Sequence, residues 1–387
     1  MDVFELTGTT LRRRAVAGFV GLALVAGAAA CGSDDDSSSS SGGDSKSAST
    51  KDAAAWKEEK AKLLDKAELQ WPRPEGEYDP GSGRVAIVSC GESDLGCHTL
   101  TEGAQEAAKA AGWQSKVFDS AFDPNKAGGF VQQAVEEGYD AIVLGAINPT
   151  LIQSAIAAAT DAGIPIGCPA CSTPDTAQYE AVMDATSGGA PGGVAATAVI
   201  ADSDAKAKVA YFYTPGQAIE AARTKEWEKK FAECADCELK LNEVPLGDLA
   251  KPGPPFFDGF LSSPEAQQVD WVGASSDAYA VPSMRTAIDR GIDRYKFAGT
   301  AAVPEMTVPM TKPDSLAQVT VAEAYRYMAW AALDNAMREK AGAETWDATA
   351  VPVGLVTPEN AAKFAKGGEL EPPEGIAETF EPLWTKG

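Results

Sequence analysis

Short hydrophobic segments alternate with segments of helical period along most of this chain, and this alternation limits its fold more than any other feature. From residue 84 onward, apolar runs of four to six residues precede stretches in which apolar positions recur every three or four residues. The predicted strands of this first series are 84–89, 115–119, 141–144 and a segment that starts at 164–166. The predicted helices between them are 100–111, 123–138 and 149–162. Buried strands that alternate with crossover helices form a parallel sheet with right-handed crossovers.

A second series of the same kind follows the first. Its predicted extended segments are 179–184, 208–213, 238–245, 271–274 and 295–299, and its predicted helices are 192–202, 218–232 and 280–290. Two series of similar size indicate an α/β protein with two similar lobes. Ligands of open α/β sheets bind beyond the carboxyl ends of the strands, so we expect a site in the cleft between the lobes.

The N-terminal residues carry the pattern of an export signal. Three arginines at 12–14 precede an uncharged apolar run at 15–30, which is shorter than a membrane span requires. Small residues then precede Cys31, and this segment resembles the bacterial lipobox, in which the cysteine is diacylated and becomes the new N-terminus. Ordinary cleavage beside an incidental cysteine is the alternative. We therefore expect a signal peptide at 1–30 and a lipid anchor at Cys31.

A tether and an additional helix precede the two series. Residues 33–50 are rich in Ser, Asp and Gly, so residues 31–51 are expected to form a flexible tether that buries little apolar surface. Residues 51–69 have helical period, and three prolines at positions 72, 74 and 80 then interrupt the chain. Residues 52–83 are therefore predicted to be an N-terminal helix and linker.

Charge and histidine content argue against several functional classes. The formal net charge of −23 predicts no nucleic-acid partner. His98 is the one histidine, so a catalytic triad or a His-rich metal site would lack imidazole. We expect no enzymatic activity, no cofactor and no metal.

The cysteines indicate structural disulfides. If Cys31 carries lipid, six cysteines remain, and their spacing suggests three local pairs: Cys90 with Cys97, Cys168 with Cys171, and Cys234 with Cys237. Outside the cytoplasm such pairs are oxidised. Two alternatives stay open. Cys168 and Cys171 could form a redox-active C-x-x-C pair, or they could join Cys90 and Cys97 in a four-thiolate metal site.

Several segments resemble one known family in their order and spacing. They are 84–89, 102–108, 118–119, 123–126, 138–144, 162–166, Asp184, 214–216 with Arg223, 276–277, and 351–360. Over about residues 84–360 the chain resembles the type I periplasmic binding proteins, the ribose- and galactose-binding group of ABC importers. Cytoplasmic repressors share this fold, but they carry a DNA-reading helix-turn-helix where this chain has a signal and an acidic tether.

The resemblance implies an architecture and a function. It implies two Rossmann-like lobes with parallel sheets, joined by a three-crossing hinge near Met183, near 319–321 and near 353–356. Lobe one would comprise 84–183 with 322–352, and lobe two 184–321 with 353–387. The protein would close on a sugar or a similar small polar ligand, present it to an ABC transporter permease, and stay attached to the membrane through its lipid anchor. A ligand-binding sensor for a membrane receptor is one alternative, and a thiol oxidoreductase that uses Cys168 and Cys171 is another.

The resemblance carries over to the binding site only in part. The family's stacking aromatics would fall at Gly96 and Cys97, its arginine after the fourth strand near Cys171, and an aspartate near Ala301. Arg223 matches a ligand-binding arginine of the second lobe, although it could also be an ordinary helix-surface arginine. Ser276 and Asp277 follow a strand where the family places a polar contact, or else they cap the next helix.

The remaining candidates come from loops that follow predicted strands. They are Ser89, Glu92, Ser93, Asp94 and His98 in the first loop, Asn148 after the third strand, and Tyr279 as a replacement aromatic. Glu92 and Asp94 could equally be solvated loop charges, and Trp227 and Trp271 are expected in the core. The glycine cluster at 188–193 lacks the Lys-Ser or Lys-Thr of a phosphate loop, so we expect it to give flexibility to the first hinge crossing.

Overall fold

The computed structural model describes residues 51–64, 69–249, 251, 255–366 and 370–385, all within one compact unit. The predicted signal peptide, Cys31 and residues 31–50 of the tether lie outside the described residues. Among the helices described, none combines the length and the apolar character that crossing a membrane requires.

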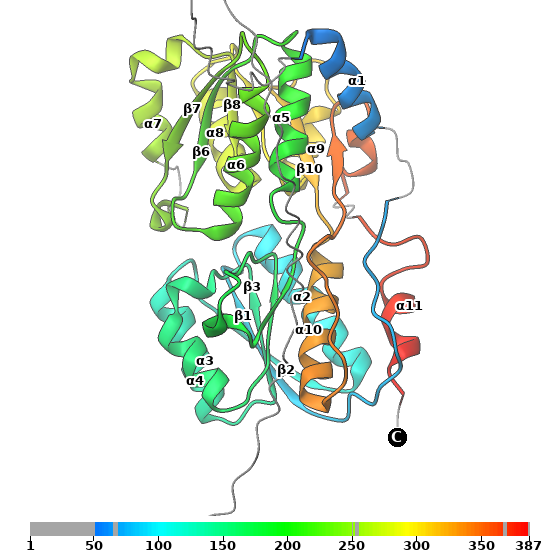
Figure 1. Ribbon diagram of the computed structural model, residues 1–387. Helices are drawn as coiled ribbons and strands as arrows, with labels where there is room; N and C mark the ends of the chain where they lie inside the picture. Colours follow the sequence, from blue (N-terminus) through cyan, green and yellow to red (C-terminus); the bar gives the residue numbers. More distant parts are fainter. Residues whose placement is uncertain (1–50, 65–68, 250, 252–254, 367–369, 386–387) are drawn as a thin grey trace, which may run out of the picture. The chain divides into compact units, whose positions relative to one another are not determined.

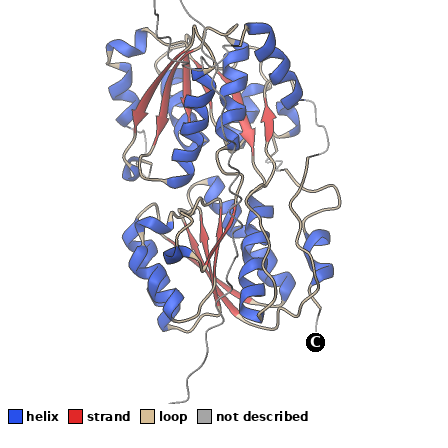
Figure 2. Cartoon of the chain, in the orientation of Figure 1, coloured by secondary structure: helices blue, strands red, loops and turns tan. Residues whose placement is uncertain are grey.

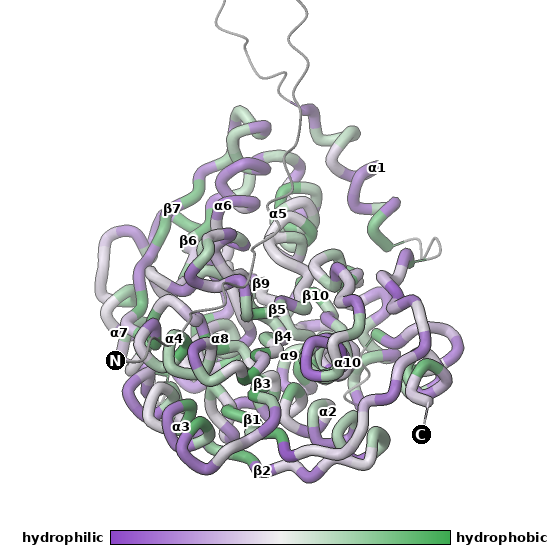
Figure 3. The backbone as a smooth tube through the Cα atoms, turned by 60° about the horizontal axis from the view of Figure 1, so that its bottom comes forward, coloured by the Kyte–Doolittle hydropathy of each residue, from purple (hydrophilic) through white to green (hydrophobic). Residues whose placement is uncertain are grey.

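The first sheet has five parallel strands in the order β2-β1-β3-β4-β5. Its strands are β1 (Arg84–Ser89), β2 (Gln114–Asp119), β3 (Ala141–Gly145), β4 (Ile166–Pro169) and β5 (Val182–Ala185). β1 has one exposed and five buried residues and pairs with β2 and β3 in register, so its apolar run covers both faces of the sheet. The hydropathy colouring of β1 and β3 is accordingly mostly hydrophobic (Figure 3).

Helices cover both faces of this sheet (Figure 1). On one face lie α3 (Pro124–Glu136) and α4 (Gln153–Asp161), and on the other lie α2 (Leu95–Ala111) and α10 (Tyr325–Ala341). We call this sheet with these helices lobe one.

The second sheet has six strands in the order β11-β10-β9-β8-β6-β7. They are β6 (Lys208–Tyr213), β7 (Glu238–Glu243), β8 (Trp271–Ala274), β9 (Lys296–Ala298), β10 (Ala317–Ala322) and β11 (Gly354–Val356). All pairings are parallel except β10 with β11. The covering helices are α5 (Ala190–Asp202) and α6 (Ala218–Ala232) on one face, and α7 (Pro255–Leu261), α8 (Asp277–Asp289) and α9 (Pro304–Met310) on the other. This sheet with these helices is lobe two, and the two-lobed α/β fold is confirmed (Figure 2).

The chain passes between the lobes three times. It leaves β5 for α5 through 186–189, leaves β10 for α10 through 323–324, and returns from α10 to β11 through 342–353. The first and third crossings are hydrogen-bonded to each other, because Thr186 N donates to Ala348 O and Val351 N donates to Thr186 O. The crossings that the sequence suggests, near Met183, 319–321 and 353–356, lie a few residues from these segments.

The glycine cluster serves close helix packing as well as the first crossing. Gly188 has a φ of +56°, a backbone conformation that favours glycine. Gly192 lies inside α5, where an added Cβ would come within 2.3 Å of the carbonyl oxygen of Arg223. A bulkier residue there would push α6 away from α5. The expectation of hinge flexibility therefore describes only the first part of this cluster.

Three helices begin at other residues than the sequence predicts. α2 begins at Leu95, five residues earlier than expected, because the Asp94 carboxylate accepts a hydrogen bond from Cys97 N. α8 begins at Asp277, and Ser276 is its N-cap, which is the capping role that the sequence offers as the alternative for this pair. The helix expected at 149–162 is a 3-10 turn at Pro149–Leu151 followed by α4.

Both terminal segments pack on the lobes. Helix α1 (Ala53–Leu64) buries Trp56 against α5 of lobe two. At the other end, α11 (Ala377–Phe380) and Trp384 pack on α10, and Trp384 stacks on Trp330 with 5.6 Å between ring centroids. The sequence assigned 353–387 to lobe two, but the part of this tail from α11 onward lies on lobe one (Figure 1). Contacts between aromatic residues so far apart in the chain leave no local sequence signal.

Candidate functional site

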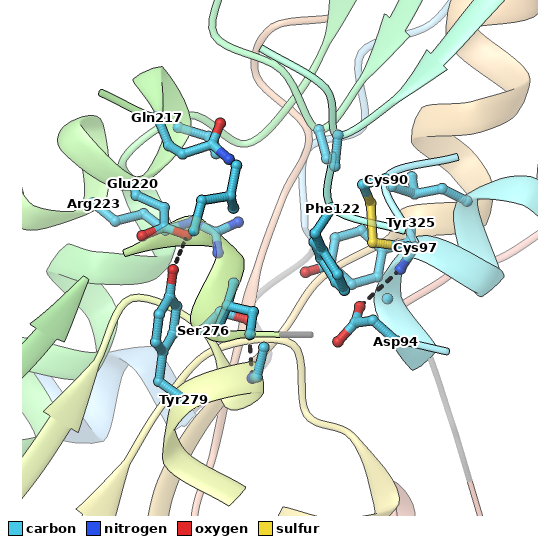
Figure 4. Close-up of a pocket in the computed structure, with 18 residues that line it drawn as sticks. Cys90, Asp94, Cys97, Phe122, Gln217, Glu220, Arg223, Ser276, Tyr279 and Tyr325 are labelled. Carbon is cyan, nitrogen blue, oxygen red and sulfur yellow. Dashed lines mark hydrogen bonds between the residues drawn. A yellow bond between two sulfur atoms is a disulfide. The ribbon is translucent and has the colours of Figure 1, made fainter. Parts of the chain in front are cut away.

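A cavity of about 110 Å³ lies between the two lobes at the carboxyl ends of their strands (Figure 4). By the usual measure of about 10–15 Å³ for one water, it has room for several water molecules or one small solute. Lobe one contributes Cys90, Asp94, Gly96, Cys97, Leu100, Phe122, Ala146 and Ala170. Lobe two contributes Gln217, Ile219, Glu220, Arg223, Leu246, Leu249, Ser276, Ala278 and Tyr279, and Tyr325 follows the second crossing.

The wall of lobe one includes three residues that follow strands and have an unusual backbone conformation. Phe122, Ala146 and Ala170 follow β2, β3 and β4 with φ values of 60°, 52° and 55°, in the left-handed region that non-glycine residues rarely adopt. The Phe122 ring lies close above Gly91, where a Cβ would meet it at 2.8 Å. Strained backbone of this kind persists where the surroundings enforce it and is concentrated at binding sites.

A disulfide joins both ends of the loop between β1 and α2. Cys90 and Cys97 line the cavity and are bonded, with 5.6 Å between their Cα atoms. The bond fixes the loop that carries Asp94. The positions where the family would place stacking aromatics are thus occupied by Gly96 and a half-cystine, and Phe122 supplies an aromatic face from the neighbouring loop.

Asp94 presents a carboxylate to this cavity (Figure 4). Its Oδ1 accepts a hydrogen bond from Cys97 N at 3.0 Å and so caps α2. Burial raises the pKa of Asp94, the backbone N–H groups of Cys97 and Gly96 oppose that rise, and the negative charge of Glu305 on α9 adds to it.

Glu220 on α6 organises the opposite wall. Its Oε1 accepts from the Tyr279 hydroxyl at 2.6 Å, and its Oε2 accepts from Thr214 N at 2.5 Å and from the Ser275 hydroxyl at 3.0 Å. Burial raises the pKa of Glu220, although these hydrogen bonds and Arg223 favour its charged form. Both carboxylate oxygens are therefore committed to the protein.

Arg223 lies in the same wall, and both terminal nitrogens of its guanidinium group donate hydrogen bonds to the protein. Nη1 donates to Ser275 O and to Thr300 Oγ1, both at 2.9 Å. Nη2 donates to Glu323 Oε1 and Oε2 at 2.9 and 2.8 Å. The sequence suggested that this fork could hold a ligand's hydroxyl pair or carboxylate. In the structure only the buried Nε–H of Arg223 has no partner.

Glu323 lies in the second crossing and is 2% exposed. Besides Arg223 it accepts hydrogen bonds from the Ser187 hydroxyl of the first crossing at 3.0 Å and from the Tyr325 hydroxyl at 2.9 Å. Arg223 and Tyr325 both line the cavity. One buried polar network therefore joins the cavity wall to two of the three crossings.

The other candidates of lobe two are committed to the protein. Ser276 lines the cavity, and its hydroxyl accepts from Ala278 N at 3.2 Å as the cap of α8. Asp277 is buried beneath the wall, where it accepts from Val303 N and Thr320 Oγ1. Burial raises the pKa of Asp277 well above its ordinary value. Tyr279 lines the cavity edge, but its fully buried ring gives no open stacking face.

The candidates of the first loop other than Asp94 lie away from the cavity. Ser89 is buried at the end of β1, and Ser93 is exposed. Glu92 accepts from Thr101 Oγ1 at 2.7 Å and lies 2.8 Å from Nδ1 of His98 on the surface. Burial raises the pKa of Glu92, but its hydrogen bonds with His98 and Thr101 favour the charged form, and the pKa is lowered overall.

Asn148 bridges the lobes beside the cavity. Its Nδ2 donates to Gly216 O of lobe two at 2.8 Å, and its Oδ1 accepts from Thr150. It lines a smaller neighbouring cavity of about 30 Å³. Of the ten predicted contact residues, the structure thus brings four to the main cavity: Asp94, Arg223, Ser276 and Tyr279.

Sequence reasoning missed Phe122, Gln217, Glu220 and Tyr325. Gln217 and Glu220 belong to the first turn of α6, directly after a strand, and that position was a usable signal. Phe122 also follows a strand and could have been found in the same way. Tyr325 depends on the second crossing and has no local signal. Trp227 and Trp271 are buried in the core as expected.

The six described cysteines form three disulfides, Cys90–Cys97, Cys168–Cys171 and Cys234–Cys237, the pairs that the spacing indicates. Cys168 and Cys171 are 0% and 2% exposed and lie within 4.8 Å of the Asp184 carboxylate. Their sulfurs are bonded to each other and buried, which opposes both thiol exchange and thiolate coordination of a metal.

Comparison with known proteins gives a family and a fold. Residues 85–344 match the family model described as a periplasmic binding protein domain. An ABC transporter solute-binding protein from Agrobacterium vitis with bound allitol superposes with a TM-score of 0.65 at 17% identity, covering 74% of this chain and 98% of the other. A solute-binding protein from Bacillus halodurans C-125 with bound myo-inositol gives 0.62 at 18% identity, with 74% and 99% covered. A sugar ABC transporter protein from Yersinia enterocolitica gives 0.65 at 15% identity, with 79% and 91% covered. A search of curated protein sequences finds no significant match.

Proposed function

Because this chain belongs to the periplasmic binding protein family, whose members are solute-binding proteins rather than enzymes, we propose that it binds a sugar or a similar small polar solute outside the cytoplasm and delivers it to an ABC transporter permease. The observation that carries this proposal is the cavity whose walls come from both lobes. A solute held there touches both lobes at once.

Closure follows from that geometry. A ligand shifts a conformational equilibrium only by its difference in affinity for the two states. A solute that contacts Phe122 on one wall and Gln217 on the other gains both contacts only when the lobes are together. The direct hydrogen bond from Asn148 to Gly216 adds a polar contact between the lobes that opening would break. The solute thus stabilises the closed form, which is the form that a permease can distinguish.

Membrane attachment is part of the same proposal. The apolar run before Cys31 and the polar residues that follow it are what a lipid-anchored protein on a flexible leash requires. Acylation of Cys31 would keep the binding lobes close to a permease in the same membrane. Mass spectrometry of the mature N-terminus tests this directly, because a Cys31→Ser variant should lose both the lipid and membrane association.

Binding itself is tested by calorimetry of the full chain against sugars, polyols and small amines. Phe122→Ala should weaken binding of any solute that binds, because it removes the aromatic face of lobe one. Ile288→Ala is the matched control, since Ile288 is 56% exposed on α8 and does not line the cavity. An absence of binding across all three classes would contradict the proposal.

A further inference from the structure

The polar groups of the cavity are mostly engaged with the protein itself. Glu220, Tyr279, Ser276 and Tyr325 use their side-chain oxygens in the hydrogen bonds described above. Among the described side chains of the wall, Gln217 makes no hydrogen bond. The other wall side chains that can still bond a solute are Ser276, whose hydroxyl accepts from Ala278 N and can donate its own hydrogen, and Asp94, whose carboxylate makes no ion pair among the described residues. A polyol carries a hydroxyl on nearly every carbon, and each hydroxyl that is buried without a partner is costly. The side chains of this cavity leave few such partners for a solute with many hydroxyls.

Much of the remaining wall is apolar. Leu100, Phe122, Ile219, Leu246 and Leu249 contribute side chains from both lobes, and the Cys90–Cys97 disulfide and three alanines add further apolar surface. Burying hydrocarbon against such a wall is favourable by about 25 cal/mol for each Å². The wall therefore suits a solute with a substantial apolar body.

The charge of the cavity is unbalanced. Arg223 is the one lysine or arginine among the lining residues, and its charge is matched by Glu323 at 2.8 Å. Asp94 makes no ion pair among the described residues, and it also experiences the negative charge of Glu305 on α9, whose own partner is Arg285 at 3.8 Å. The potential at the Asp94 end of the cavity is therefore negative, which disfavours an anionic solute.

We propose that this cavity selects a small organic cation, whose ammonium group pairs with Asp94 and whose apolar body packs on Phe122 and the surrounding leucines. This inference rests on the proposed function, since it keeps the same cavity and the same delivery to a permease, but it names a small cation as the solute in place of a sugar. The Phe122 and Tyr325 rings add cation–π attraction near Asp94.

The electrostatic surroundings of Asp94 agree with this assignment. Its pKa is raised chiefly because burial penalises the charged form, and no cation within the described part of the chain offsets that penalty. A bound ammonium group would supply the missing charge. A carboxylate offers about four lone-pair sites, so the bonds from the Cys97 and Gly96 N–H groups leave room for a solute's ammonium group.

The test uses matched probes on the full chain by isothermal titration calorimetry. Choline is compared with 3,3-dimethylbutan-1-ol, in which carbon replaces the charged nitrogen, and cyclohexylamine is compared with cyclohexanol. Glucose and myo-inositol represent neutral polyols. At least one cation should bind about tenfold or more tightly than its neutral analogue, because hydrogen bonds and ion pairs that involve a charged group are among the strong ones.

Asp94→Asn should abolish that preference and keep the helix, because asparagine caps as well as aspartate. Asp94→Ser, another good cap, serves if the first variant is destabilised. Asp52→Asn is the control, since Asp52 accepts a hydrogen bond from Ala55 N on α1 and does not line the cavity.

Three results would overturn the inference. Binding of glucose or myo-inositol without either cation would overturn it and leave the proposed function standing. A preference for the cation that survives in Asp94→Asn would overturn it as well. Binding of none of the six probes would count against both the inference and the proposed function.

Discussion

Replacing Glu323 by alanine should destabilise this protein strongly, because that change leaves the Arg223 guanidinium buried without its counter-charge. Arg223 and Glu323 have side chains that are 5% and 1% exposed and meet through two hydrogen bonds of 2.8–2.9 Å. Removing one partner of a buried pair typically costs about 3–5 kcal/mol. The variant also leaves the hydroxyls of Ser187 and Tyr325 without an acceptor.

Urea denaturation followed by tryptophan fluorescence measures this loss in the free energy of unfolding. The double variant Arg223→Met with Glu323→Leu should cost less than Glu323→Ala alone, because no buried charge remains unpaired. Asp258→Asn is the control, since Asp258 pairs with Arg290 at the surface and such pairs contribute at most about 1 kcal/mol. A cost below about 1 kcal/mol for Glu323→Ala would refute the argument. A double variant whose cost equals the sum of the costs of Arg223→Met and Glu323→Leu, each measured alone, would refute it as well.

Two further predictions concern a surface histidine and a buried glycine. The hydrogen bond to Glu92 raises the pKa of His98 above its usual 6.5, although burial opposes the rise. The stabilising contribution of His98 is therefore complete below about pH 6.5 and is lost as the pH rises through the folded-state pKa. The urea midpoints of His98→Gln and of the parent should converge between about pH 6 and about pH 9, and a constant difference would contradict this. Gly192→Ala should lower the free energy of unfolding by about 1–3 kcal/mol, because the added Cβ would lie 2.3 Å from Arg223 O. Gly129→Ala, at an exposed position of α3, should be neutral or slightly stabilising. Equal costs of the two changes in urea titrations would refute the packing argument.

The strands of this fold are readable from the sequence because they are buried on both faces. Residues 208–213 and 271–274 were expected as strands and are β6 and β8, with the same ends. Short continuous apolar runs that alternate with helical segments indicate buried strands. Helix 218–232 is equally clear, because charged residues mark its exposed face.

Helix α10 was not read as a helix, for a physical reason. Its buried residues include Asp334, Asn335 and Arg338 as well as alanines and aromatics, so its sequence has no polar face that marks the surface. The polar groups are buried because they bond the terminal segments: Asp334 accepts from Tyr78 and from Trp384. Those partners lie far away in the chain, and so the pattern looks irregular until the fold is known.

The candidate site was predictable in its place but not in its chemistry. Parallel strands and crossover helices imply a site at the strand ends, and the cavity is there. Whether a side chain is free for a solute depends on partners from other crossings. Arg223 was a reasonable candidate for a ligand fork, yet its partner Glu323 lies 100 residues away in the sequence. The place of Phe122 after a strand is readable from the sequence, but the left-handed backbone conformation at this residue is not.

The same network gives the cavity a direct physical connection to the hinge. Tyr325 contributes its ring to the cavity and its hydroxyl to Glu323, and Glu323 also binds Ser187 in the first crossing. Arg223 does the same from lobe two, since it lines the cavity and its Nη2 donates to Glu323. A solute that contacts either side chain therefore touches a residue that already holds a crossing in place. Because a buried charge tolerates few alternative arrangements, any rotation that separates Arg223 from Glu323 is costly. Opening of the lobes is consequently expected to pivot around this ion pair and leave it intact, while the hydrogen bond from Asn148 to Gly216 across the cleft breaks.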